Sequence, residues 1–194
     1  SASISSDLPS DKFIVGFTLE GFHTVLQDAF FLQPIGEDAF GQVFEKQNGQ
    51  GATVQGLTLE LRANYNRILQ LESGFTVQSS IFEESVHYID ELPGIKPFIR
   101  TPNQYGFATL SYTPTKKLAA NLNYVYTGSM KVLHFAGAPN QSVNEIIDSE
   151  DFHELSGKVS YTVTPKNLET GFEVFVGVRN GLNAYQASFD IGKN

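Results

Sequence analysis

The sequence predicts an all-β fold, an antiparallel transmembrane β-barrel, and three observations support this class. Apolar and polar side chains alternate with a period of two, the alternating segments are long, and short and long connections follow one another in turn. Successive side chains of a strand point to opposite faces, whereas a helix would scatter both sets around its circumference. Together these observations favour strands that cross a membrane.

The composition limits the classes of protein to consider. The chain has 194 residues, of which 41% are hydrophobic and 18% charged, so disorder is not expected. Cysteine is absent, which excludes disulfides and thiolate metal ligands. The net charge of −8 argues against a nucleic-acid partner, because no basic stripe offsets it.

Seven strands are expected. In the segment 52–66, Leu57, Leu59 and Leu61 fall on one face, and polar residues occupy the positions between them. Most of the segments exceed the roughly 5–6 residues of a soluble strand, and a strand that crosses a bilayer needs about 9–11. In chain order, the expected strands lie near residues 13–24, 52–66, 69–81, 107–112, 118–129, 154–163 and 172–179.

The connections between these strands alternate in length. Outer-membrane barrels have short periplasmic turns and longer loops on the outside. The short turns are expected at residues 7–12, 66–68, 114–117 and 165–167. The long connections are residues 27–51, 83–103 and 131–151, and the tail from Gly181.

One face of the expected strands is too polar for a dry interior. Burying Glu60, Arg62 or Glu72 without a partner would cost several kcal/mol each. We therefore expect these three residues to face a hydrated lumen and a plug, with pairing between charges on adjacent strands. The apolar face then meets lipid, with tyrosines near strand ends as an interfacial girdle. The alternative is a soluble antiparallel sheet with one face on a core, which alternates in the same way.

The segment GVRNGLNAY (177–185) begins within the last expected strand and continues past its end, and it carries the most specific motif of the chain. Val178, Asn180, Asn183 and Tyr185 hold the places of a valine, two asparagines and an aromatic. This spacing resembles the penultimate-strand signature of TonB-dependent outer-membrane receptors, with a mild departure at the two residues after Asn180. Three further segments resemble the sub-group of Bacteroides-type bacteria: EGFHTVLQDAF (20–30), RTPNQYGFATLSYTP (100–114) and YVYTGSMKVLHFAG (124–137).

The resemblance implies that residues 1–194 are the C-terminal portion of one β-barrel domain, a fragment of a plugged barrel of roughly 22 strands. Family members end with one more strand after the loop that begins at Asn183, whereas this chain stops at Asn194. Seven is also an odd number of strands, and complete bacterial barrels have an even number. We therefore expect the plug, the TonB-contacting segment and the final strand to be absent. The implied partners are outer-membrane lipid and, through the missing N-terminal part, the plug and TonB; no cofactor is implied.

Ligand contact is expected in the long connections. The candidates are Phe30, Phe31, His87 and His134, because binding residues concentrate on loops held by a rigid scaffold. Phe30 and Phe31 fit a loop-packing role equally well.

The other titratable residues carry no catalytic or metal-binding pattern, and neither an enzyme nor a metal site is expected. The histidines are far apart, and His23 and His153 fall on apolar strand faces near strand ends, which favours a girdle role. The acidic run of Asp148, Glu150, Asp151 and Glu154 favours a solvated loop, because hard cations need a fixed cage of oxygens.

These features predict a transporter in the outer membrane of a Gram-negative bacterium. It would capture an iron–siderophore complex, haem, cobalamin or a similar scarce nutrient. Two alternatives stay open: a complete small outer-membrane barrel with a structural or adhesion role, and a soluble β-sandwich binding module. The ligand itself cannot be read, because the loops that select it carry no transferable code.

Overall fold

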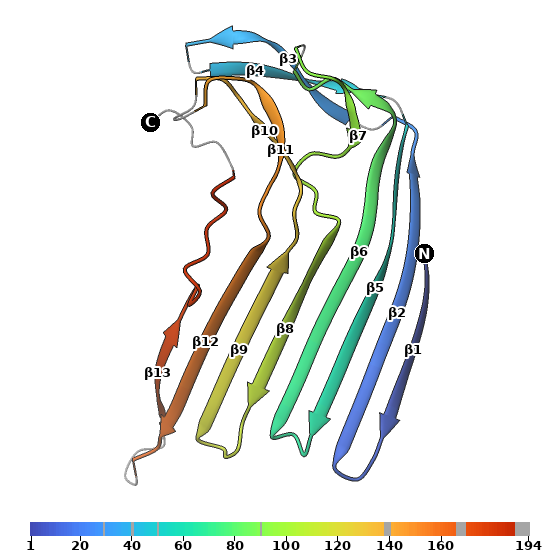
Figure 1. Ribbon diagram of the computed structural model, residues 1–194. Helices are drawn as coiled ribbons and strands as arrows, with labels where there is room; N and C mark the ends of the chain where they lie inside the picture. The colour runs from blue at the N-terminus through green and yellow to red at the C-terminus, as the bar shows by residue number, and fades with distance from the viewer. Residues whose placement is uncertain are drawn as a thin grey trace.

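The computed structural model describes residues 1–28, 30–39, 41–49, 51–89, 91–137, 141–165 and 170–188, and its long strands form one curved antiparallel sheet (Figure 1). We call this sheet the wall. Strands β1 and β13 lie at its opposite edges, so the described sheet is open. Along the wall the strands are β1 (Ala2–Pro9), β2 (Phe13–Leu26), β5 (Ala52–Tyr65), β6 (Leu69–Val86), β8 (Gln104–Tyr112), β9 (Leu118–Thr127), β12 (Phe152–Val163) and β13 (Phe172–Val178).

A second layer covers one end of the wall. Here two hairpins and the short strand β7 (Ile95–Pro97) lie at the end opposite the tight turns (Figure 1). We call the described residues of 30–48, 83–103 and 131–151 the loop layer. Its hairpins are β3 (Phe30–Asp38) with β4 (Gly41–Asn48), and β10 (Lys131–His134) with β11 (Glu145–Asp148).

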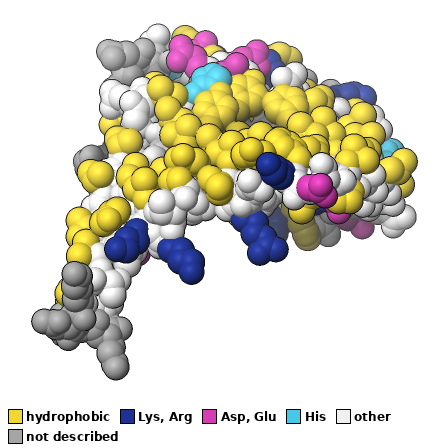
Figure 2. Space-filling model, turned by 90° about the horizontal axis from the view of Figure 1, so that it is seen from below, with side chains coloured by type: hydrophobic (Ala, Val, Ile, Leu, Met, Phe, Trp, Pro, Cys, Tyr) yellow, Lys and Arg dark blue, Asp and Glu magenta, His cyan; other side chains and the backbone are white. Residues whose placement is uncertain are grey.

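The register of the wall places the apolar side chains on a single face. Leu19, Leu59 and Phe75 are directly opposite one another on β2, β5 and β6, and each is more than 40% exposed. Figure 2 shows hydrophobic side chains over the convex side of the curve, with several Lys and Arg side chains on the concave side. No second sheet or helix packs on the described convex face. It therefore matches a surface made for lipid rather than for a protein core.

The strand lengths suit a membrane crossing. β2 and β5 have 14 residues each and β12 has 12, against the roughly 9–11 that a tilted strand needs to cross the hydrocarbon. The tight turn between β5 and β6 places Asn66 and Arg67 at φ 51° and 60°. This left-handed pair twists in the same sense as the strands that it joins. The described residues contain no helix long and apolar enough to cross a membrane.

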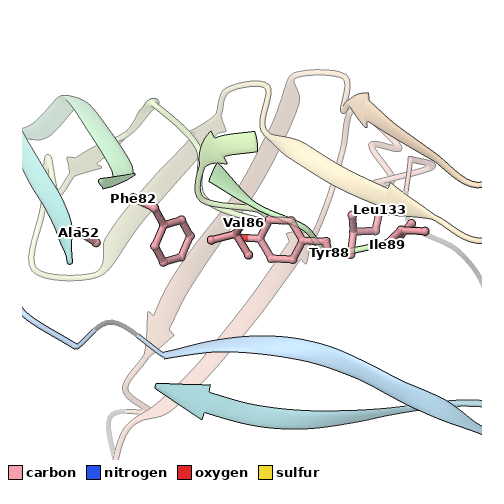
Figure 3. Close-up of a cluster of buried hydrophobic side chains, with 6 residues drawn as sticks. All are labelled: Ala52, Phe82, Val86, Tyr88, Ile89 and Leu133. Carbon is pink, nitrogen blue, oxygen red and sulfur yellow. The ribbon is translucent and has the colours of Figure 1, made fainter. Parts of the chain in front are cut away.

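The hydrophobic core of the described chain lies at the loop-layer end. It joins Ala52 and Phe82, from β5 and β6, to Val86 and residues of the loop layer (Figure 3). Phe82 is 3% exposed, and its ring centre lies 4.3 Å from that of Phe98. Burying a side chain of this size contributes about 1.5–3 kcal/mol. The cluster consists of Ala52, Phe82, Val86, Tyr88, Ile89 and Leu133.

Two expectations about the strands were wrong. The expected seven wall strands are eight, because Ala2–Pro9 forms β1, paired with β2 from Ala2↔Gly21 to Pro9↔Ile14. The sequence did not reveal this strand because its serines weaken the alternation of Ala2, Ile4 and Leu8. With eight wall strands the number is even, and the argument for a missing final strand from an odd number no longer holds. The long connections were treated as loops, whereas they carry β3, β4, β7, β10 and β11. Part of the expected turn at 165–167 lies outside the described residues.

A charge on the convex face is expected to block membrane assembly. In the full-length protein, Leu59→Arg should cost about 2–4 kcal/mol if this position is near the middle of the bilayer. The fraction of heat-modifiable, folded protein in the membrane should fall accordingly. Gln70→Arg is the control, because Gln70 is exposed on the concave face of the neighbouring strand. Equal assembly of the two variants would contradict the assignment of the faces.

Candidate functional site: the concave face and the loop layer

A row of polar side chains crosses the concave face at one height. The register aligns Asp7, Gly16 and Arg62 on the first three strands of the wall. Arg62 Nη2 lies 3.5 Å from Asp7 Oδ1, and the pair reaches across Gly16, where a side chain would collide with the Asp7 carboxylate. The row continues through Glu72, Thr109 and Asn123, and Asn123 Nδ2 donates to Thr109 Oγ1 at 3.0 Å.

The three charged residues singled out from sequence therefore share the concave face, but the ion pair is a different one. Arg62 pairs with Asp7 on β1, a strand that the sequence did not reveal. Glu72 is directly opposite Arg62, and Glu60 lies one row nearer the loop layer. The Arg62–Asp7 pair is about half exposed, so its contribution to stability is about 0–1 kcal/mol.

Nearer the loop layer, aromatic rings interrupt the polar concave face. The ring of Phe22 covers Gly56 and that of Phe107 covers Gly74, at distances that leave no room for a Cβ on either glycine. Thr58 and Thr76 form a hydrogen bond between their hydroxyls at 2.9 Å in the same region. Each phenylalanine lies directly opposite a glycine of a neighbouring strand, an arrangement in which the ring shields the exposed backbone of the glycine. These Phe–Gly pairs could have been found from the sequence once the strands were aligned.

The candidate ligand contacts in the loop layer do not converge on one point. Phe30 opens β3, is exposed, and holds Lys46 Nζ 4.1 Å from its ring centre. Phe31 pairs with Gln47 in the same hairpin, and its side chain lies outside what the structure describes. His87 is exposed, and its Nδ1 lies 3.3 Å from the carbonyl oxygen of Leu92.

His134 differs from these candidates because it contacts the tail. Its Nε2 lies 2.6 Å from the carbonyl oxygen of Ser188, and the Ser188 hydroxyl accepts from the backbone N–H of Glu150 at 3.2 Å. Ser188 thus joins the tail to both sides of the β10–β11 segment. This role was not evident from sequence, because 54 residues separate His134 from Ser188.

The two hairpins of the loop layer also contact each other. The rings of Phe44 in β4 and Phe135, next to β10, have centres 5.9 Å apart and meet edge to face. Such a pair contributes about 0.5–1.5 kcal/mol beyond its buried area. The loop layer is therefore a packed unit rather than a set of separate loops.

The acidic residues around the β11–β12 connection bind neighbouring groups of the protein. Asp148 pairs with Lys131 at 2.8 Å, and Asp151 Oδ1 accepts from the backbone N–H of Ser129 at 2.8 Å. Glu154 accepts from the Ser156 hydroxyl at 3.2 Å. Within the described part of the chain, no three His, Asp or Glu side chains are grouped so that they could hold a metal ion.

The comparison with protein families decides the identity of the fold. Residues 4–180 match the family described as TonB dependent receptor-like, beta-barrel. The chain belongs to this family. The match confirms the resemblance to TonB-dependent receptors, while the Bacteroides-type sub-group and the roles of Val178, Asn180, Asn183 and Tyr185 as family-signature residues stay predictions.

A solved structure of the same architecture is the FrpB iron transporter from Neisseria meningitidis (F3-3 variant). The two chains are 16% identical, with a TM-score of 0.54, over 93% of this chain and 26% of that one. At this identity the likeness shows the fold alone, and this chain spans about a quarter of the FrpB chain. A comparison with curated proteins found no match.

In this receptor barrel the signature asparagines shape the end of β13. Asn180 and Asn183 have φ angles of 51° and 52°, the left-handed region that asparagine tolerates better than most residues. The Asn180 side chain donates to Ala184 O at 2.8 Å and accepts from Ala184 N–H at 2.9 Å. The two bonds close a compact turn at which the chain leaves the wall. Val178 ends β13, and Tyr185 is 74% exposed.

Asn180→Ala in the full-length receptor is expected to loosen residues 181–188. It removes two hydrogen bonds, about 1 kcal/mol each, and places alanine in a left-handed conformation that costs about 1–2 kcal/mol. Limited proteolysis of receptor in membranes, read by mass spectrometry, should show faster cleavage in this segment. Asn180→Gly keeps the backbone conformation and should have a smaller effect. Unchanged cleavage in both variants would refute a structural role for the signature.

Tyr88 should make the loop layer sensitive to alkaline pH. Burial raises the pKa of its phenol above the ordinary 10.0, against a smaller lowering by a hydrogen bond with the Ile99 backbone. The folded receptor favours the neutral phenol, so its stabilising effect is complete below pH 10 and is lost as pH rises through the raised pKa. The phenolate absorbance of the Tyr88→Phe variant should lack one of the late-titrating tyrosines of the parent protein. A Tyr88→Phe titration identical to the parent curve would contradict this prediction.

Proposed function

We propose that this chain supplies wall strands and ligand-facing loops to a transporter in the outer membrane of a Gram-negative bacterium. The observation that carries this proposal is the convex belt of exposed Leu, Val and Phe side chains over strands of membrane-spanning length. Membership of a receptor family supports the same conclusion. The family's receptors are transporters rather than enzymes, and no enzymatic role is proposed.

Residues 1–194 are proposed to be the C-terminal portion of one barrel domain, with the plug and the final strand supplied by the rest of the protein. Within the described sheet, no strand pairs with the outer edges of β1 and β13. This supports the proposal, because an edge strand in lipid leaves backbone groups without partners. Energy would arrive from TonB through the plug. Glu60, Arg62 and Glu72 are proposed to face that plug from the concave side.

The proposed cargo is a scarce nutrient such as an iron–siderophore complex, haem or cobalamin. FrpB is an iron transporter, which supports iron among these, although the likeness itself concerns the fold. Phe30, Phe31 and His87 are proposed as ligand contacts because they belong to the loop layer, at the end of the wall opposite the tight turns. His134, which contacts Ser188, is proposed to act with them by holding the tail.

The two rival functions are less well supported. A soluble β-sandwich needs its apolar faces packed together, and here that face is exposed on β2, β5, β6, β8, β9 and β12. A complete small barrel needs its first and last strands to pair, and β1 and β13 lie at opposite edges of the sheet. Neither rival is proposed further.

Transport is tested by deleting the gene of the full-length receptor in its host. Uptake of radiolabelled iron–siderophore, haem and cobalamin should be compared with and without an uncoupler of the inner-membrane proton gradient. One cargo should lose its uncoupler-sensitive uptake in the deletion strain and regain it with the intact gene. Unchanged uptake and growth with every limiting nutrient, alongside normal assembly in the outer membrane, would overturn the transporter proposal.

A further inference from the structure

The dipeptide of asparagine followed by glycine occurs twice in the chain, in two different environments. Asn48–Gly49 lies where strand β4 ends, and Asn180–Gly181 begins two residues after β13 ends. In this dipeptide the backbone nitrogen of glycine can attack the side-chain amide carbon of the asparagine, because glycine has no Cβ to hinder the approach and its backbone rotates freely. Asparagine is accordingly among the residues that are chemically labile on heating.

Asn48 is placed where this reaction can occur. It is exposed, and it lies directly opposite Phe30 at the open end of the β3–β4 hairpin. Gly49 follows the last paired residue and belongs to no strand. Among the residues that the structure describes, neither the Asn48 side chain nor the Gly49 N–H has a hydrogen-bond partner. No hydrogen bond to a described residue therefore has to break before the two reacting atoms approach each other.

Asn180 has the opposite surroundings. Its side-chain amide forms two hydrogen bonds with the backbone of Ala184, and the Gly181 N–H donates to the carbonyl oxygen of Leu155 at 2.7 Å. Attack requires the glycine nitrogen and the amide carbon to approach to about 3–3.5 Å in the correct orientation. All three hydrogen bonds oppose this movement, and the attacking nitrogen is itself the donor in one of them. The fold therefore holds the two reacting atoms of this dipeptide in place.

We propose that Asn48 is a self-modification site, and that the folded chain protects Asn180 from the same reaction. The Gly49 nitrogen loses its proton and forms a bond to the side-chain carbon of Asn48, which closes a cyclic imide. The bond from that carbon to the side-chain nitrogen breaks, and ammonia leaves with the proton. Water then opens the ring at either carbonyl, which gives aspartate or its isomer with the backbone routed through the side chain. The net reaction consumes water and releases ammonia, without oxidation or reduction.

The product changes the charge of the β3–β4 hairpin. Lys46 lies two residues before Asn48 on the same side of β4, about 7 Å along the strand. Its Nζ is 4.1 Å from the centre of the Phe30 ring, and Phe30 is directly opposite Asn48. A carboxylate at position 48 competes with this ring for the ammonium, because exposed ion pairs and exposed cation–π contacts are similar in strength. This inference rests on the chain's own chemistry and not on transport.

The test follows both asparagines in the full-length receptor, folded in detergent micelles and incubated in mildly alkaline buffer. Samples are digested briefly at acidic pH, and mass spectrometry separates asparagine, aspartate and isoaspartate at positions 48 and 180. Asn48 should convert at least about tenfold faster than Asn180, because three hydrogen bonds protect the latter. The rate at Asn48 should rise with pH, since the attacking nitrogen must lose its proton.

The denatured receptor is the matched control. In guanidinium chloride both dipeptides lose their surroundings, and Asn48 and Asn180 should then convert at similar rates. This result would show that the difference in the folded receptor comes from the structure and not from the flanking residues. The same ratio of rates in the folded and the denatured receptor would overturn the inference.

Gly49→Ala should slow the conversion of Asn48 severalfold, because a methyl group next to the nitrogen hinders its attack. Gly181→Ala is the counterpart and should leave Asn180 as slow as before; a Cβ there would lie 3.5 Å from its nearest neighbour, an ordinary contact. Heat modifiability verifies folding of each variant, and the comparison within the parent receptor decides the matter if a variant does not assemble. Equal rates at the two asparagines of the folded receptor, or a rate at Asn48 that Gly49→Ala leaves unchanged, would also overturn the inference.

Discussion

The two-residue alternation of the wall strands, held in register against one another, is the constraint on which the rest of the structure depends. A slip of one residue in any strand would bring its apolar side chains to the polar side and its charges into lipid. The register instead sets Leu19, Leu59 and Phe75 side by side on one face and Asp7 and Arg62 close together on the other. An apolar surrounding on one side and a polar one on the other thus penalise every register that is shifted by an odd number of residues.

The hydrophobic core is displaced from the wall to the loop layer for a physical reason. Apolar side chains on the convex face gain nothing from packing together, because lipid is already apolar. Beyond the membrane, water returns and burial is again favourable. Ala52 and Phe82, at the ends of β5 and β6, therefore pack with Tyr88 and Leu133 of the loop layer. The loop layer is in this way fixed to the strands that carry it.

Glycines occupy the positions of the wall where a side chain would collide with a side chain of the neighbouring strand. At Gly16 the missing side chain leaves room for the Asp7–Arg62 ion pair. At Gly56 and Gly74 it leaves room for phenylalanine rings on the concave face, and at Gly106 for the Phe75 ring on the convex face. Each is fixed by the identity of its neighbour on the next strand. This is why the wall is not uniform on either face: aromatic rings cover glycines on both.

The sequence by itself determined the fold class, the two faces and the alternation of short and long connections, because these depend only on local order. It also located the signature asparagines, whose left-handed backbone is a local property of Asn180 and Asn183. It could not place β1, whose serine-rich strand has little contrast until β2 supplies a partner. Nor could it find the Arg62–Asp7 pair, the His134–Ser188 contact or the packed loop layer, since each joins residues far apart in the chain. Periodicity depends on residues that are neighbours in the sequence, so it can be recognised without a structure. Contacts between distant segments form only when the register and the curvature of the sheet bring those segments together.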